Sequence, residues 1–292
     1  MVTVHRSPIE VVAHRGCGTA FTQPDAPPEN SRLAVEAAWQ AGADACEIDV
    51  HLTADGRVVV IHDETTERTA DRSLIVRDTS LADLQKLDAG SWKGGQWSGV
   101  RISTLEEVLT TIPPGKRLLI ELKTGPKIVL PLSRVLEAAG TDPNQLVVMS
   151  FDFETTAESK RRMPAIAHLF LAMFDFEPVA SEWSVIWQAT DPSTGNSREL
   201  RQQPVDVQAL IERVQAAGLD GINVSHHQPE DLFLSMRDAG VEWSVWTVND
   251  PLVAIAMAVK GVASITSDRP QLIARELHQH GFATAPRGPG IR

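Results

Sequence analysis

The 292-residue chain lacks the features that mark secreted, membrane-spanning and nucleic-acid-binding proteins. Its two cysteines, Cys17 and Cys46, are too few for a disulfide framework, and we expect both to be buried, reduced thiols. No apolar run reaches the roughly 18 residues that a membrane-spanning helix needs. The formal net charge of −11 opposes binding to nucleic-acid backbones, which depends on Lys and Arg. These absences predict a globular protein with no nucleic-acid partner and no stable membrane insertion.

The N-terminus shows no pattern of an export signal. Its opening residues, MVTVHRSPIEVVAHRG, pass directly into a strand pattern. They do not contain a charged segment followed by a long apolar segment and a cleavage site of small residues. We therefore expect a cytoplasmic protein.

What the chain does contain is a repeated alternation of strand-like and helix-like segments. Strands that are separated by helices of about 10–15 residues pair in parallel through crossover connections. Repeated along one chain, this pattern predicts an α/β fold, a closed (β/α)₈ TIM barrel with a small insertion after the third strand. The expected strands are 9–16, 45–53, 57–63, 117–124, 145–152, 165–172, 220–226, 242–248 and 263–268. The expected helices are 28–42, 103–112, 126–139, 153–163, 205–217, 229–239, 250–260 and 270–280.

Two segments interrupt the alternation. Residues 64–102 have too little apolar content for a regular layer, which predicts the insertion. Residues 173–204 contain Trp183 and Trp187 and read as irregular, either a lid over the site or a segment packed outside the barrel. We predict a single domain over 1–282, followed by a flexible Gly/Pro-rich tail at 283–292.

Polar residues gather at the carboxyl ends of the predicted strands. Active sites of parallel barrels are built at that end, so these residues are candidates for a shared site. They are His14, Asp49, Glu121 with Lys123, Ser150 with Asp152, Ser225 with His226, Trp246 and Asp268.

The stretch EIDVHLTADGRVVVIHD, which begins at Glu47, carries an unusual run of polar side chains. Glu47, Asp49 and His51 alternate with apolar residues and therefore share one face of a strand. An Asp-Gly pair after that strand predicts a two-residue hairpin turn, which would place His62 directly opposite Asp49. The alternative is a hairpin face that is simply solvated.

Three carboxylates, those of Glu47, Asp49 and Glu121, would repel one another at a barrel rim unless a positive charge lay between them. A divalent cation with oxygen ligands meets this need, and Mg²⁺ or Ca²⁺ is favoured over zinc because no Cys/His set accompanies the acids. The alternative is a structural salt bridge in which Lys123 alone neutralises the acids.

Two histidines and an arginine extend this group. His14 and His62 end their strands, and a pair of imidazoles near a cation suits general acid and base catalysis. Arg15 can hold a tetrahedral oxyanion with its guanidinium, and Gly16 lets the chain pass close to a ligand. Each residue alone would be ordinary, but with Lys123 and a cation they predict hydrolysis at phosphorus.

Seven segments, taken in order, resemble the glycerophosphodiester phosphodiesterase family. The resemblance covers nearly the whole chain, and the combination of motifs at these spacings is highly specific. It implies a phospholipase-C-like TIM barrel, capped by a small insertion at 64–102, that hydrolyses glycerophosphodiesters to an alcohol and glycerol 3-phosphate. The segments are AHRG (13–16), PEN (28–30), ACEIDVHLTADGRVVVIHD (45–63), STLEEVL (103–109), IELK (120–123), WTVND (246–250) and ITSDRP (265–270).

The resemblance also implies roles for individual residues. The histidines that match the family motif, His14 and His62, would act as acid and base. The matching acids, Glu47, Asp49 and Glu121, would bind one divalent cation, Mg²⁺ or Ca²⁺.

The remaining matches concern the substrate. Arg15 and Lys123 would contact the phosphate, and Glu29 of the PEN segment would lie near the site. Asn30 of the same segment, in contrast, could be only a helix cap, a role for which asparagine is favoured. Trp246 would line the mouth of the pocket, unless it is an ordinary core residue of a barrel strand.

Alternatives of function remain open at this point. The chain could act on lysophospholipids as a phospholipase D, or bind phosphodiesters without turning them over. Two departures from the family pattern stand out: Ser103 replaces a usual proline at a helix entry, and an extra residue in ITSDRP could reposition Asp268. The native cation, the leaving alcohol and the oligomeric state do not follow from the sequence.

Overall fold

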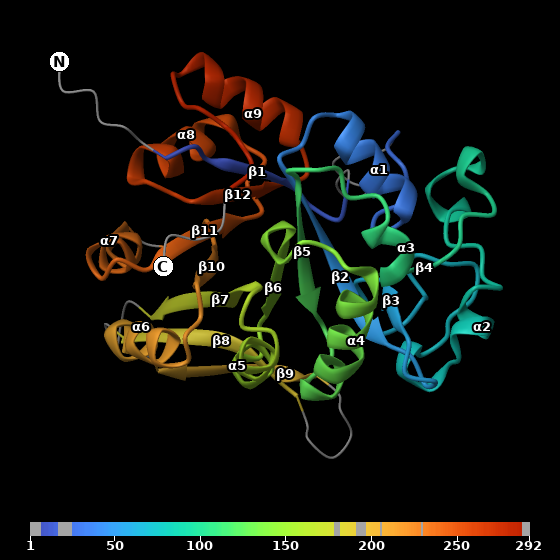
Figure 1. Cartoon of the computed structure of the whole chain (residues 1–292). Coiled ribbons are helices and arrows are strands. Elements are labelled where there is room, and N and C mark those ends of the chain that lie inside the picture. Colours follow the sequence, from blue (N-terminus) through green and yellow to red (C-terminus); the bar gives the residue numbers. More distant parts are fainter. Residues whose placement is uncertain are drawn as a thin grey trace.

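The computed structural model describes residues 7–16, 25–177, 182–190, 197–204, 206–228 and 230–287, with the backbone alone over 174–204. Eight of the described strands form a closed barrel in which every neighbouring pair is parallel (Figure 1). The predicted fold is therefore confirmed. In order around the barrel, the strands are β1 (Glu10–Ala13), β2 (Ala45–Leu52), β5 (Arg117–Leu122), β6 (Leu146–Ser150), β7 (Ala167–Glu177), β10 (Gly221–Ser225), β11 (Glu242–Trp246) and β12 (Ser264–Ser267).

Helices follow the barrel strands and cover the outside of the barrel (Figure 1). Several begin at a polar residue whose side chain accepts a hydrogen bond from the first turn, as Asp152, Asp206 and Asp250 do. The helices are α1 (Arg32–Gln40), α3 (Leu105–Leu109), α4 (Val129–Ala139), α5 (Phe153–Arg162), α6 (Val207–Ala216), α7 (Glu230–Asp238), α8 (Pro251–Lys260) and α9 (Pro270–Gln279).

The core has an outer layer, between strands and helices, and an inner layer inside the barrel. On β2, Ile48 and Val50 belong to the outer layer, whereas Ala45 packs inside. Successive side chains of a strand point to opposite faces, so Glu47 and Asp49 must point inward with Ala45. The same alternation on β5 places Leu119 and Glu121 inside the barrel. The predicted sharing of one face by these acids thus follows from the packing.

The hairpin after β2 differs from the prediction in its register. β3 (Val58–Val60) pairs antiparallel with β2, and Val50 lies opposite Val60. The amide of Thr53 donates to the carbonyl of Arg57 at 2.9 Å, which leaves a three-residue loop. Gly56 alone adopts a positive φ, +74°, among the loop residues, whereas a two-residue turn of the predicted type needs two such residues. The predicted pairing of Asp49 with His62 is therefore wrong, since Asp49 is bonded to Ile61 instead.

The insertion lies between β3 and β4 (Ser103–Thr104), beside the hairpin (Figure 1). It contains η1 (Val76–Asp78), α2 (Leu81–Leu84), η2 (Ser91–Lys93) and η3 (Gly95–Trp97). A small core of its own holds it against the hairpin. This core consists of Val59, Ile61, Val76, Leu81, Leu84, Leu87 and Ile102.

The segment 173–204, which was expected to be irregular, is largely β-structure. β7 continues to Glu177 and pairs antiparallel with β8 (Glu182–Thr190), which pairs antiparallel with β9 (Ser197–Pro204). The alternation of polar and apolar residues over 174–177 and over most of β8 fits a strand better than a loop. The side chains of Trp183 and Trp187 lie outside the described part of the chain, so the proposed lid stays a prediction.

The C-terminal segment is fixed to the barrel at its beginning. Ile9 donates to the carbonyl of Ala283 at 3.0 Å, and the amide of Arg287 donates to Glu10 at 3.0 Å. The tail predicted to be flexible at 283–292 is therefore tied down as far as Arg287, and its remainder lies outside the described residues. Within the described ranges, no helix has the length and apolarity needed to cross a bilayer. Cys46 is buried in β2, and Cys17 is outside these ranges.

Candidate active site

A cavity of about 450 Å³ lies at the carboxyl ends of the barrel strands. This volume is typical of small-molecule sites, which span about 300–1,000 Å³. Of the nine residues predicted for the site, Asp49 and Glu29 lie behind the cavity wall. The other seven line it, and they are His14, Arg15, Glu47, His62, Glu121, Lys123 and Trp246.

The turn after β1 brings Arg15 close to β2. Arg15 has a positive φ of 52°, and its amide donates to Oε2 of Glu47 at 2.9 Å. Gly16 follows at φ 91°, where an added Cβ would lie only 2.6 Å from Cβ of Ala34. Glycine is thus needed for the chain to turn against α1, which explains the sequence His-Arg-Gly in physical terms.

The turn before α1 supports the carboxylate of Asp49. Asn30 was expected to cap the helix, but Ser31 is the N-cap residue and accepts from Ala34. Asn30 instead donates through Nδ2 to Oδ2 of Asp49 at 2.8 Å, and its Oδ1 accepts from the amide of Asp49 at 3.0 Å. The prediction that Asn30 is a cap is wrong, because its amide serves to orient Asp49.

Glu47, Asp49 and Glu121, which we call the carboxylate cluster, are buried together inside the barrel. Each offers an oxygen that lies within 4.8 Å of the others. Nζ of Lys123 lies 3.0 Å from Oδ1 of Asp49 and 2.5 Å from Oε1 of Glu121. Nε of Arg15 lies 3.4 Å from Oδ2 of Asp49. Two cationic side chains therefore contact two of the three carboxylates, those of Asp49 and Glu121.

Among the described residues, no cationic side chain forms an ion pair with the carboxylate of Glu47. Burial, together with the neighbouring charges of Asp49 and Glu121, raises the pKa of Glu47 well above its ordinary value. Burial also favours a higher pKa for Asp49, but Lys123 and Arg15 outweigh it and hold that pKa well below its ordinary value.

The carboxylate cluster fits a divalent cation. Oxygen ligands of one Mg²⁺ or Ca²⁺ lie about 2.0–2.6 Å from the ion, so oxygens within 4.8 Å of one another can share it. Two cations against three buried carboxylates leave a negative charge for such an ion to balance. The alternative, in which Lys123 alone neutralises the acids, does not account for Glu47. Lys123 contacts Asp49 and Glu121, and the pKa of Glu47 is raised.

His14 is held by a buried carboxylate from the opposite end of the chain. Its Nδ1 lies 2.7 Å from Oδ1 of Asp268, which follows β12. Asn249 fixes this carboxylate, because its Nδ2 donates to Oδ2 of Asp268 at 2.7 Å and its Oδ1 accepts from the amide of Asp268 at 2.9 Å. Burial favours a higher pKa for Asp268, but the contacts with His14 and Asn249 lower it below its ordinary value. The ionised carboxylate leaves Nε2 of His14 as the ring nitrogen for proton transfer.

His62 is held in a similar way from the hairpin side. Its Nδ1 lies 2.6 Å from Oδ1 of Asp63, and Oδ2 of Asp63 accepts from Nε of Arg68 at 2.6 Å. The hydrogen bond with His62 and the ion pair with Arg68 keep the pKa of Asp63 below its ordinary value. The ring of His51 is also buried, and its Nε2 donates to the carbonyl of His62 at 3.0 Å. Burial lowers the pKa of His51 to about 4, so this ring is neutral at pH 7.

The carboxylate of Glu29 accepts hydrogen bonds from two arginines and does not line the cavity. Its Oε1 accepts from Nη1 of Arg15 at 2.8 Å and from Nη2 of Arg68 at 2.9 Å, and its Oε2 accepts from Nη1 of Arg68 at 3.0 Å. Arg68 was not predicted from the sequence, because it lies within a polar insertion without periodicity. Asp63 had a weak signal, its position directly after His62.

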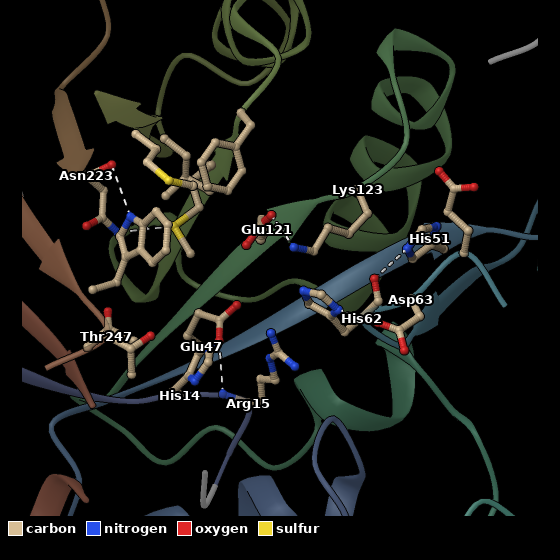
Figure 2. A pocket seen from close by; sticks show the side chains of 17 residues that line it. His14, Arg15, Glu47, His51, His62, Asp63, Glu121, Lys123, Asn223 and Thr247 are labelled. Atoms are coloured by element: carbon tan, nitrogen blue, oxygen red, sulfur yellow. Dashed lines mark hydrogen bonds and ion pairs between the residues drawn. The ribbon is translucent and has the colours of Figure 1, made fainter. Parts of the chain in front are cut away.

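The cavity has an apolar wall opposite His62. In Figure 2 the sulfur-bearing and aromatic side chains gather on the side of Asn223, whereas Arg15 lies between His14 and His62, and Lys123 points toward Glu121. The rings of Phe151 and Trp246 meet edge to face with centroids 5.5 Å apart. The wall consists of Met149, Phe151, Leu171, Met173 and Trp246.

Comparison with known proteins assigns the chain to a family. The sequence profile described as "Glycerophosphoryl diester phosphodiesterase family" matches residues 14–272. The chain belongs to this family. With this membership it is a phosphoric diester hydrolase, as the motifs of the sequence predicted.

Members of the family from several bacteria resemble the chain along most of its length. A glycerophosphodiester phosphodiesterase of Caldanaerobacter subterraneus is 32% identical over 247 residues, covering 79% of this chain and 98% of that protein. A Bacillus subtilis protein, YhdW, which is provisionally named for the same activity, is 30% identical over 269 residues, covering 91% and 97%. A phosphodiesterase structure from Oleispira antarctica, in complex with the product sn-glycerol-3-phosphate, superposes with a TM-score of 0.74 at 26% identity, covering 92% of this chain and 96% of that one.

Proposed function

We propose that this family member hydrolyses glycerophosphodiesters to an alcohol and glycerol 3-phosphate, with one divalent cation, Mg²⁺ or Ca²⁺, held by the carboxylate cluster. One observation carries the proposal. Two histidines that each have a carboxylate on Nδ1 line the same cavity as two members of the cluster, Glu47 and Glu121. Binding a phosphodiester would not require two such proton-transfer groups, whereas its hydrolysis does.

The two imidazoles would carry the protons of the reaction. One takes a proton from the attacking hydroxyl, either of water or of the glycerol 2-position, as a new bond to phosphorus forms. The other gives a proton to the leaving oxygen as its bond to phosphorus breaks. If water attacks, both imidazoles regain their starting protonation by proton exchange with solvent. If the 2-hydroxyl attacks, water then opens the resulting cyclic phosphate with the two imidazoles in exchanged roles. One water is consumed overall in either case. Both histidines suit either part, because each is held in one tautomer by its carboxylate.

Arg15 and Lys123 would hold the phosphate. Both line the cavity within an otherwise acidic protein, so they supply the local positive charge that a phosphodiester needs. Glu29 would act at one remove by fixing the guanidinium of Arg15. Trp246 would line the leaving-group side, where it packs against Phe151.

Glu47, Asp49 and Glu121 would hold the cation. When bound, a divalent ion offsets the charge that develops on the phosphoryl oxygens. Asn30 and Lys123 fix Asp49 beforehand, so one ligand would be oriented before the ion arrives.

The test is turnover measured across cations. The purified protein, treated with a chelator, is assayed on glycerophosphocholine and other head-group variants with Mg²⁺, Ca²⁺ or no added ion. Glycerol 3-phosphate and the alcohol should appear in equal amounts, only when an ion is present. A folded protein that binds these diesters but does not cleave them with either ion would favour the binding function instead.

A second candidate function is supported by the apolar wall. Met149, Phe151, Leu171 and Met173 offer no partner for a small polar alcohol, but they would suit the acyl chain of a lysophospholipid. Comparing kcat/KM for glycerophosphocholine with that for a long-chain lysophosphatidylcholine separates the two. A higher value for the lysolipid would favour a phospholipase D activity, and a lower one the glycerophosphodiester.

A further inference from the structure

We propose that Arg68, from the insertion, is a positioning residue that fixes His62 through Asp63 and links it to Arg15 through Glu29. The inference rests on the proposed function, because it assigns to Arg68 the support of a histidine that acts in that reaction. Arg68 itself is not among the residues that line the cavity. Its contribution would therefore be indirect.

The guanidinium of Arg68 bonds two carboxylates at once. Its Nε donates to Oδ2 of Asp63 at 2.6 Å, and its two terminal nitrogens donate to the two oxygens of Glu29 at 3.0 and 2.9 Å. A planar fork with fixed donors holds both acids in a defined relative position, which a lysine could not do.

Asp63, held by Arg68, in turn holds the ring of His62 in one orientation. One oxygen of Asp63 is bound by Arg68, and the other lies 2.6 Å from Nδ1 of His62. The His62 and Asp63 side chains are 31% and 29% exposed. Water would therefore compete for the hydrogen bond between them unless a second residue held Asp63 in place. Arg68 is that residue, and the tautomer with hydrogen on Nδ1 follows from the ionised state of Asp63.

Glu29 extends the chain of contacts to the arginine of the phosphate site. Its Oε1 accepts from Arg68 and also from Nη1 of Arg15, at 2.8 Å. The side chain of Glu29 is only 2% exposed, so the two guanidinium groups share a buried anion. The proposed phosphate-binding group and the proposed proton-transfer group are thus joined by a continuous series of charged hydrogen bonds.

The insertion offers a matched control. Arg77 is 39% exposed, against 37% for Arg68, and it also faces two acids, Glu64 at 4.0 Å and Asp78 at 3.7 Å. It contacts neither Asp63 nor Glu29 in the hydrogen bonds of the described residues. Replacing Arg77 therefore removes a comparably exposed arginine of the insertion and leaves the hydrogen bonds of Arg68 with Asp63 and Glu29 in place.

The experiment compares R68A, R68K and R77A with the wild-type protein on a glycerophosphodiester, with its cation present. R68A should lower kcat about 10- to 100-fold, the range found when outer-shell partners are removed. R68K should recover only part of the loss, and R77A should match the wild type. Methylguanidinium added to R68A should restore part of kcat, and it should not restore the double variant R68A/D63N, because the carboxylate that it would bind is then missing.

A second measurement reports on His62 without turnover. The ¹⁵N shifts of its ring, assigned by comparison with H62Q, should show hydrogen on Nδ1 in the wild type and in R77A, and a mixture of tautomers in R68A. Unchanged kcat and an unchanged tautomer in R68A would overturn the positioning role while leaving the proposed function intact. A wild-type protein without turnover would instead overturn the proposed function and, with it, the catalytic meaning of this inference.

Discussion

The two histidines of the site are held alike but by different parts of the molecule. His14 directly follows the barrel strand β1, and its partner Asp268, which directly follows β12, is fixed by Asn249. His62 lies after a hairpin strand, and its partner Asp63 is fixed by Arg68 from the insertion. The exposed fractions of the side chains differ accordingly, 17% and 7% in the first pair against 31% and 29% in the second.

This difference indicates how the site is divided between barrel and insertion. The pairing of β1 with β12 brings His14 and Asp268 together, because it places Ala13 beside Ser267. The pair at His62 needs a further element, since the residue that anchors Asp63 belongs to a segment with a small core of its own. We expect the first pair to tolerate surface changes and the second to depend on the insertion.

The largest expected effect comes from removing either imidazole. H14A and H62A should each lower kcat about 10²- to 10⁴-fold, which is the usual contribution of a general acid or base. Initial rates on a glycerophosphodiester measure the loss, and chemical unfolding checks that the fold remains. H280A, on the exposed end of α9, is the control and should be unaffected. An unfolded H14A or H62A would return that histidine to a structural role.

Replacing the carboxylates that hold the two histidines should have a smaller effect, and this effect should differ between the two pairs. D268N should lower kcat about 100-fold and D63N about 10-fold, within the range for outer-shell partners. The buried amide of D268N would present its NH2 group to either His14 or Asn249, where a carboxylate oxygen accepts in the wild type, whereas water can reach the more exposed site of D63N. The ratio of the two kcat values is the measurement. A greater loss in D63N would contradict the division proposed between barrel and insertion.

The smallest expected effect concerns His168, whose ring has no carboxylate partner among the described residues. His168 is buried on β7, where it bonds Ser159 and the carbonyl of Ile166 at 2.8 and 2.9 Å. Burial lowers its pKa from 6.5 to about 4, so unfolding takes up a proton between these values.

The sign of this effect is fixed by the direction of the shift. The unfolded state binds more protons below pH 6.5, so the free energy of unfolding should fall as the pH falls toward 4. By pH 5 the loss from His168 should be about 1–2 kcal/mol. Denaturant titrations at pH 8 and pH 5 should show a smaller difference in H168Q than in the wild type or H280Q. Equal differences would show that His168 is not neutral in the folded protein.

The fold and the core of the site could be predicted because they depend on the alternation of helices and strands and on the positions of polar residues along the strands. The alternation of helices and strands implies the barrel, and the spacing of two residues between Glu47 and Asp49 places both on its inner face. The polar ends of the strands then meet at one rim without further information.

The remaining features depend on geometry that the sequence leaves open. An Asp-Gly pair fits both a two-residue and a three-residue loop, so the hairpin register was predicted wrongly. Asp268 reaches His14 across 254 positions only because the barrel closes. Arg68 lies in an insertion without periodicity, and nothing in its neighbours indicated that it would face Glu29 and Asp63.

The most direct test of the account is a crystal structure of the protein soaked with Ca²⁺ and sn-glycerol 3-phosphate. We predict the ion within bonding distance of oxygens from Glu47, Asp49 and Glu121. The phosphate should lie between the Nε2 atoms of His14 and His62. A phosphate bound away from these histidines, or an ion bound without the three carboxylates, would contradict the proposed reaction.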